Sequence, residues 1–438
     1  MLQYRGKISE GEAPRTRFRF AGAARLIVLL LFSVSCFYGY SVLTHEAVVD
    51  SLWDASIQKM LLKRFPATTP EELQKAHAYV YGGCILQDMG YYPFGSRMFS
   101  DLTHYVRSGD FIVALLRESQ DVNEYAFALG ALAHYAADNN GHRIATNLAV
   151  PILYPKLRGQ FGTQVTYWDN PNAHIRTEFG FDVLQVASGR YAPSGYRNFV
   201  GFKVSKPVLE RAFQDTYGIE MKDVFANLDL AIESFRYSVN SIIPGMTKVA
   251  WTLKGADIQK EIPGMTRDKF LYNLSRASYE KEWGNDYQKP GIRTRMTAFF
   301  LRVVPKIGPF KSLAVKLPTP EVEKMFMASF NATVDNYRML LANQDAGQLK
   351  LVNENFDLGE QTPAGAYAGT DQTYDDLLTK LADHHFKGLS VELRANLLAY
   401  YKDRKGPVAP VTKKAGAEWV KVKDHLEKLQ STPAIASN

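Results

Sequence analysis

The sequence predicts an all-α fold, and two observations carry this prediction. Apolar residues recur three and four positions apart along most of the 438 residues, as they do on one face of a helix. Alternating patterns typical of strands are scarce, and only residues 160–167 and 198–204 are candidates for short strands. A hydrophobic content of 46% with 22% charged residues is typical of a folded globular protein.

The first 39 residues are expected to be a signal peptide, because a basic stretch that ends at Arg25 precedes a short apolar run. The run at 26–40 is short for a membrane span, although an uncleaved N-terminal anchor stays an alternative. We therefore expect an exported protein, periplasmic or secreted, or a membrane-anchored one if the leader is not cleaved. The leader also holds more than half of the net charge of +7, so the charge does not indicate nucleic-acid binding by the remaining residues.

Several helices can be placed by the signals at their ends. Thr69 is expected to cap a helix that starts at Pro70 and carries Glu72 in a capping box. This helix is expected to run towards Leu86, with Asp88 at its end. Further helices are expected at 123–140, 208–217, 224–242, 321–340 and 391–401, with a loop at 343–372 and a polar, loosely ordered tail at 403–438.

Histidines and carboxylates recur in a pattern that indicates a metal site. His134, Asp138 and His142 are spaced four apart, so on a helix they form one polar stripe, and His174 with Glu178 forms a second. Two such helices facing each other would supply five ligands of the kinds that zinc prefers in hydrolytic sites. Three more candidates precede them in the sequence: His45, Asp88 and His104.

The order of these eight residues resembles the bacterial zinc-dependent phospholipase C family and the related fungal single-strand-specific nucleases. Both carry an early His, an Asp, a His, a His-x-x-x-Asp-x-x-x-His helix and a final His-x-x-x-Asp or His-x-x-x-Glu. Glu178 matches the phospholipase version, and the resemblance runs from Tyr40 to about residue 185. It implies a multi-helical catalytic domain at 40–255, a helical extension of unknown role at 256–402, and the tail at 403–438.

The resemblance also implies three zinc ions. The implied ligands are Asp88, His104, His134 and Asp138 for the first ion, His142, His174 and Glu178 for the second, and His45 and Asp138 for the third. In this family the backbone of the first mature residue completes the third site, and here that residue would be Tyr40, where Trp is usual. Asp88 is the candidate catalytic residue, because it would orient or deprotonate the attacking water.

The activity implied by the resemblance is a metal-dependent phosphodiesterase that hydrolyses phospholipid head-group esters through a zinc-activated water. Two alternatives stay open: a single-strand-specific nuclease or nucleotidase with the same trinuclear site, and a zinc-stabilised binding protein without turnover. The aromatic residues at 88–99 suit an alkylammonium head group or a nucleobase equally, or they pack the loop.

Residues 289–316 are basic and apolar and contain no acidic side chain. This composition suits contact with an anionic membrane surface. The alternative is a segment whose apolar side joins the core and whose cations face solvent.

Overall fold

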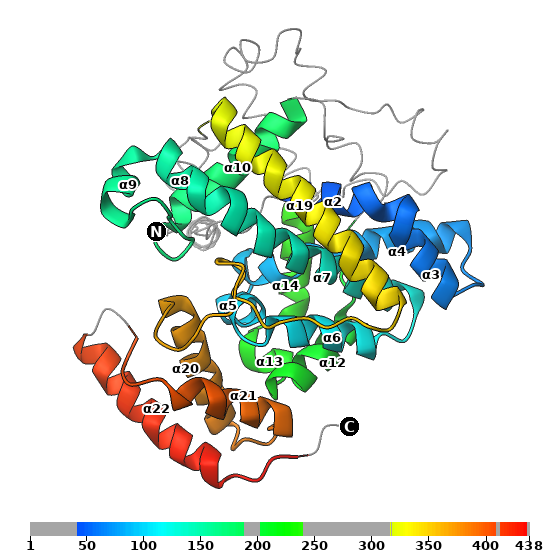
Figure 1. Cartoon of the computed structure of the whole chain (residues 1–438). Coiled ribbons are helices and arrows are strands. Elements are labelled where there is room, and N and C mark those ends of the chain that lie inside the picture. Colours follow the sequence, from blue (N-terminus) through cyan, green and yellow to red (C-terminus); the bar gives the residue numbers. More distant parts are fainter. Residues whose placement is uncertain (1–41, 188–201, 240–315, 317, 409–411, 436–438) are drawn as a thin grey trace, which may run out of the picture.

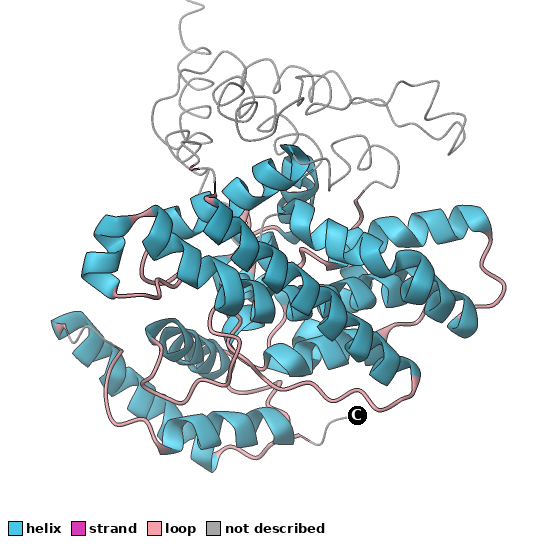
Figure 2. Cartoon of the chain, turned by 45° about the horizontal axis from the view of Figure 1, so that its top comes forward, coloured by secondary structure: helices cyan, strands magenta, loops and turns pink. Residues whose placement is uncertain are grey.

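The computed structural model describes residues 42–187, 202–239, 316, 318–408 and 412–435. Figure 2 shows that these residues form helices joined by loops, and no strand occurs within the described ranges. The predicted all-α fold is therefore confirmed. None of the described helices is long and apolar enough to cross a bilayer. The expected leader, Tyr40 and residues 289–315 lie outside the described part of the chain, so export and membrane contact stay predictions.

Helix α7 (Val122–Gly141) is the central element, because every one of its residues from Glu124 to Gly141 is buried. It packs against α2 (Val42–Leu52), α4 (Pro70–Gly83), α6 (Ser108–Glu118) and α19 (Pro320–Asp345). Two glycines let α4 and α7 approach closely. A Cβ on Gly130 would lie 2.1 Å from the carbonyl oxygen of Val80, and one on Gly83 would lie 2.0 Å from that of Phe127.

Side-chain caps mark helix starts that the sequence predicts. Thr69 Oγ1 accepts a hydrogen bond from Glu72 N at 3.2 Å, and Glu72 Oε2 accepts one from Thr69 N at 2.9 Å, so the predicted capping box of α4 is confirmed. Asp121 caps α7 by accepting from two backbone N–H groups of its first turn. The predicted helices at 208–217 and 391–401 correspond to α12 (Lys206–Tyr217) and α21 (Val391–Lys402).

The helix α4 is shorter than predicted. It ends at Gly83, and Asp88 lies in a separate 3₁₀ turn, η3 (Gln87–Tyr91). The chain bends here because Gln87 Nε2 donates to the Ala131 carbonyl of α7 at 3.2 Å, while the Gln87 carbonyl accepts from the Ser100 hydroxyl. These two bonds fix the turn that presents Asp88.

Two other predicted elements differ from the structure. The helix predicted at 224–242 begins later in the structure. Val224 is the last residue of α13 (Met221–Val224), and α14 (Leu228–Tyr237) starts after Asn227, which caps it by accepting from Leu230 N at 2.9 Å. Residues 240–242 lie outside the described part of the chain. The prediction of a strand at 160–167 is wrong, because these residues form the end of α9 (Pro155–Phe161) and a loop. The described part of the other candidate, residues 202–204, is not a strand either, and Lys203 N donates to the Ala78 carbonyl of α4 at 2.9 Å.

The remaining elements of the N-terminal half position the site or connect it. They are η2 (Trp53–Ile57), α3 (Gln58–Arg64), α5 (Arg97–Tyr105), η4 (His142–Thr146), α8 (Asn147–Leu153) and α10 (Pro171–Ala187). The π-helix η4 continues directly from the C-terminus of α7, and α10 packs against α2 and α8. Helix α10 therefore brings its polar stripe to the same end of α7 as η4.

The C-terminal part of the chain returns to the same core. Figure 1 shows α19 lying across α7, followed by a loop that leads to α20 (Ala368–Asp383), α21 and α22 (Lys413–Ser431). The loop between α19 and α20 lies where the sequence predicts one. Within the polar, loosely ordered tail predicted for 403–438 lies helix α22, whose Val422 and Leu429 are buried against the neighbouring helices. The predicted domain boundaries stay predictions.

Candidate metal centre

Helix α7 presents the first group of polar side chains. His134 and Asp138 lie one turn apart on its buried face, both fully shielded from solvent. His134 Nδ1 donates to the Cys84 carbonyl at 3.0 Å, so its Nε2 faces Asp138 Oδ2 at 3.1 Å. A buried histidine whose Nδ1 is held by a carbonyl keeps its Nε2 as the electron-pair donor, which is the form that binds metal.

Two more elements, η3 and α5, bring candidate ligands to the same carboxylate. His104 of α5 donates from Nδ1 to the Ser100 carbonyl at 2.7 Å, and its Nε2 lies 3.4 Å from Asp138 Oδ2 and 3.5 Å from Asp88 Oδ1. Asp88, His104 and His134 therefore converge on the Oδ2 side of Asp138.

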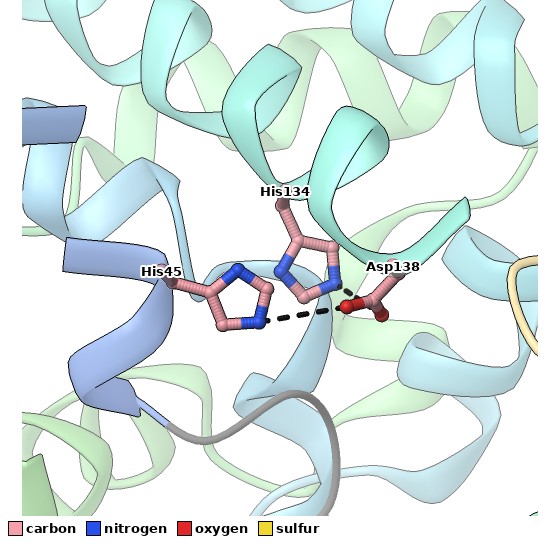
Figure 3. Close-up of side chains that lie close together, drawn as sticks. All are labelled: His45, His134 and Asp138. Atoms are coloured by element: carbon pink, nitrogen blue, oxygen red, sulfur yellow. Dashed lines mark ion pairs between the residues drawn. The ribbon is translucent and has the colours of Figure 1, made fainter. Parts of the chain in front are cut away.

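His45 approaches Asp138 from the other side. Its Nε2 lies 3.5 Å from Asp138 Oδ1, and its ring stacks on that of His134 at 4.6 Å (Figure 3). Helix α2 is held in this position by Asp182 of α10, which accepts from Leu43 N at 3.0 Å and from the Thr44 hydroxyl at 2.7 Å. The two oxygens of Asp138 thus face two different sets of imidazoles, as a bridging carboxylate requires.

A second group forms where α7 ends and α10 passes. Glu178 Oε1 lies 3.2 Å from His142 Nε2 and 3.2 Å from His174 Nδ1. His142 Nδ1 donates to the Phe356 carbonyl at 3.0 Å, and His174 Nε2 donates to Asn147 Oδ1 at 3.0 Å. Each imidazole therefore turns its free nitrogen towards Glu178.

The spacing of these atoms fits zinc. Ligands about 2.0–2.1 Å from a tetrahedral zinc ion lie about 3.3 Å from one another, and the ion-pair distances within the groups run from 3.1 Å to 3.5 Å. The facing atoms also lack hydrogen bonds within the protein, among them both oxygens of Asp138, both of Glu178, and His142 Nε2. Buried charges without hydrogen-bond partners are costly, and divalent cations bound in the separate groups would satisfy them.

Burial and charge act in opposite directions on these groups. Burial by itself opposes the charged forms, yet contact with Asp138 and Asp88 raises the pKa of His104 well above its ordinary value. His134 and His142 likewise outweigh burial and hold the pKa of Asp138 well below its ordinary value. Burial, aided by the charge of His134, lowers the pKa of His45 to about 3, so this imidazole is neutral.

All eight predicted ligands from His45 to Glu178 lie in these groups. The structure brings together His45 with His134 and Asp138, then Asp88 with His104 and His134, and then His142 with His174 and Glu178. Their roles as ligands stay predictions, and Tyr40 lies outside the described residues. His77 does not join them, because it is buried in a stack on Trp53 at 3.7 Å and its Nε2 lies 3.3 Å from Asp50.

Sequence reasoning missed three residues that contact the candidate ligands: Asn147, Phe356 and Asp357. Asp357 Oδ1 lies 3.6 Å from His142 Nδ1, and the Phe356 ring centroid lies 5.3 Å from that of His104. Neither residue belongs to a motif, since both follow α19 in a loop more than 200 positions after His142. No local spacing could have indicated them.

Comparison with known families assigns the segment with the candidate ligands to a protein family. Residues 44–227 match the family described as zinc dependent phospholipase C. The predicted resemblance is therefore confirmed for this segment, which covers every candidate ligand from His45 onward. No curated protein and no solved structure matches the chain.

Proposed function

From the zinc-dependent phospholipase C segment at 44–227, we propose that the chain is a phosphodiesterase that hydrolyses the head-group esters of phospholipids. One observation carries the proposal. Asp138 is fully buried, with His45 on one oxygen and His104 and His134 on the other. A carboxylate shared in this way is what two adjacent cations need, and adjacent cations suit displacement at phosphorus.

Different groups of residues would hold each of the three ions. The Oδ2 side of Asp138, with Asp88, His104 and His134, suits one ion, and the group of His142, His174 and Glu178 suits a second. His45 with Asp138 Oδ1 suits a third, for which the backbone of Tyr40 would complete the ligand set. When bound, such ions lower the pKa of water to about 7 and offset charge on phosphoryl oxygens.

Asp88 is the residue that we propose to act on the attacking water. It is buried, and its Oδ1 lies 3.5 Å from His104 Nε2 and makes no hydrogen bond within the protein. Burial raises the pKa of Asp88 above its ordinary value, although His104 and His134 oppose the rise. A carboxylate with a raised pKa is a better proton acceptor at neutral pH, as a general base requires.

Aromatic side chains beside the ligands support a substrate with a cationic or flat group. The ring of Tyr91 lies 5.9 Å from His104, that of Tyr167 lies 6.0 Å from His174, and the two tyrosines are 6.2 Å apart. Such rings suit an alkylammonium head group by cation–π contact. They also stack nucleobases, so a single-strand-specific nuclease or nucleotidase stays the second candidate.

The test is a parallel assay of the full chain on phosphatidylcholine vesicles and on denatured DNA, with zinc content measured for each protein. Asp138→Asn removes the shared carboxylate, so we expect loss of bound zinc and a fall in lipid hydrolysis beyond the about 100-fold that loss of an outer-shell partner costs. Asp335→Asn on the exposed face of α19 is the matched control, since the Asp335 side chain is 74% exposed and pairs only locally with Arg338.

Each result separates the candidates. Hydrolysis of lipid alone supports the proposal. Hydrolysis of DNA alone supports the second candidate, a single-strand-specific nuclease. Bound zinc with neither activity indicates a zinc-stabilised binding protein. A wild-type protein without zinc, or an Asp138→Asn variant that keeps full activity, overturns the metal chemistry itself.

A further inference from the structure

The loop between α19 and α20 carries a tight turn, Asn355–Glu360, which we call the strap. It lies outside the segment that the family covers, residues 44–227, yet it contacts the metal centre. We propose that the strap is a positioning element that orients the histidines of the His142, His174 and Glu178 group for zinc.

The first contact is direct. The carbonyl of Phe356 accepts the Nδ1 proton of His142 at 3.0 Å, and Asp357 Oδ1 lies 3.6 Å from the same nitrogen. With Nδ1 held in this way, only Nε2 of His142 is available as a ligand, and it faces Glu178 at 3.2 Å. Partners of this kind fix both the tautomer and the ring orientation of a ligating histidine.

The second contact passes through one amide. Asn147 Nδ2 donates to the carbonyl of Asp357 at 2.6 Å, and Asn147 Oδ1 accepts from His174 Nε2 at 3.0 Å. The bond to the strap thereby decides which way the Asn147 amide is turned, because its NH₂ is used by the strap and its oxygen is left for His174. Both histidines of the group are thus oriented from the same turn.

The strap also covers the other ligands. Phe356 N donates to the His104 carbonyl at 3.1 Å, and the Phe356 ring lies 5.3 Å from His104 and 6.0 Å from His134. Figure 1 shows the loop that carries the strap crossing in front of α5, the helix of His104. The strap therefore joins both groups of ligands through one short piece of backbone.

The turn is built to hold one conformation. Asn355 Oδ1 accepts from Asp357 N at 2.9 Å, and Asn355 Nδ2 donates to the Thr370 hydroxyl at 3.0 Å. Gly359 has a φ of 64°, which favours glycine, and a Cβ here would lie 2.2 Å from the Asn139 carbonyl oxygen at the end of α7. Only glycine lets the strap lie this close to the helix that carries the ligands.

The Asp357 carboxylate anchors the strap on its other side. Its Oδ2 accepts hydrogen bonds from the Tyr105 hydroxyl at 2.9 Å and from the Tyr367 hydroxyl, and its side chain is buried. Two tyrosines thus fix the carboxylate that faces His142. Charge beside the Nδ1 proton of a ligating histidine increases the basicity of the imidazole, which strengthens its bond to a metal.

The experiment measures zinc affinity of the full chain by competition with a chromophoric chelator, so it needs no turnover. Asn147→Ala cuts the link from the strap to His174, and Gly359→Ala displaces the strap without touching a ligand. We expect both variants to bind the zinc ion of the His142, His174 and Glu178 group about 10- to 100-fold more weakly, and Asn147→Ala to leave the affinity for the other ions unchanged. Glu360→Gln is the control, because its exposed side chain lies on the same turn and is expected to leave zinc binding unchanged.

Far-UV circular dichroism and thermal unfolding check that each variant is folded. Wild-type affinity for every ion in Asn147→Ala overturns the proposal, even if Gly359→Ala does not fold. Weaker binding in Asn147→Ala with unchanged binding in a folded Gly359→Ala also overturns it, since the effect would then belong to Asn147 alone. The inference rests on the zinc sites of the proposed function and not on its substrate, so absence of phosphodiesterase activity would leave it standing.

Discussion

The close contact between α4 and α7 makes Gly130→Ala an informative perturbation. The added Cβ would lie 2.1 Å from the Val80 carbonyl oxygen and 2.9 Å from Cys84 N, both backbone atoms of α4 and its end. Ordinary contact begins near 3.4 Å, so the two segments must separate by more than 1 Å. Backbone atoms cannot move aside as a flexible side chain can, so the strain falls on the helix packing.

The displacement has a cost in stability and a consequence at the metal centre. Overpacking of this kind destabilises the protein by up to about 3 kcal/mol, and the higher helix propensity of Ala stabilises it by about 1 kcal/mol. We therefore expect the free energy of unfolding to fall by about 2 kcal/mol. The Cys84 carbonyl would also move away from His134 Nδ1, which it now holds at 3.0 Å. Loss of that hydrogen-bond partner is expected to weaken binding of the zinc ion at Asp88, His104 and His134 about 10- to 100-fold.

Urea unfolding and zinc titration measure the two effects, and Gly159→Ala supplies the matched control. Gly159 lies in α9 with no atom within 4 Å of the position of a Cβ, so the same change should stabilise the protein by up to about 1 kcal/mol and leave zinc binding intact. A Gly130→Ala protein with the stability and zinc affinity of wild type would refute the argument. It would mean that the distance between α4 and α7 does not control His134.

Two further predictions concern pH and metal removal. Burial raises the pKa of Asp101 from 3.8 to about 6, so the folded state binds this proton more tightly and wild-type stability should fall by about 2 kcal/mol between pH 4 and 6 relative to Asp101→Asn. Urea midpoints at both pH values test this, and parallel changes in the two proteins would contradict it. Removal of zinc should lower the unfolding midpoint, because an ion present at 100 times its Kd stabilises the folded state by about 2.7 kcal/mol. Calorimetry with and without excess chelator measures the difference, and identical midpoints would show that no ion contributes.

Local pattern accounts for much of the fold. The capping box of Thr69 and Glu72 predicts the start of α4, because both partners lie within one turn and need no tertiary contact. The same reasoning explains the stripe of His134 and Asp138, since a spacing of four places two side chains on one face of any helix. Reasoning from local pattern fails at Gln87, where hydrogen bonds to α7 and α5 turn the chain, so that α4 ends earlier than predicted.

The sequence was enough to name the candidate ligands, but it could not predict which residues surround them. The order of imidazoles and carboxylates from His45 to Glu178 pointed to metal chemistry, because those side chains have few other reasons to recur at such intervals. What holds each ring depends on contacts between residues far apart in the chain. Phe356, whose carbonyl accepts the hydrogen bond, lies 214 positions from His142. Every residue has a backbone carbonyl, so the sequence does not indicate which one will be the acceptor. Tertiary packing alone decided that a loop from the C-terminal part would hydrogen-bond to histidines of the N-terminal half, because hydrogen bonds of this kind depend on position in space and not on residue type.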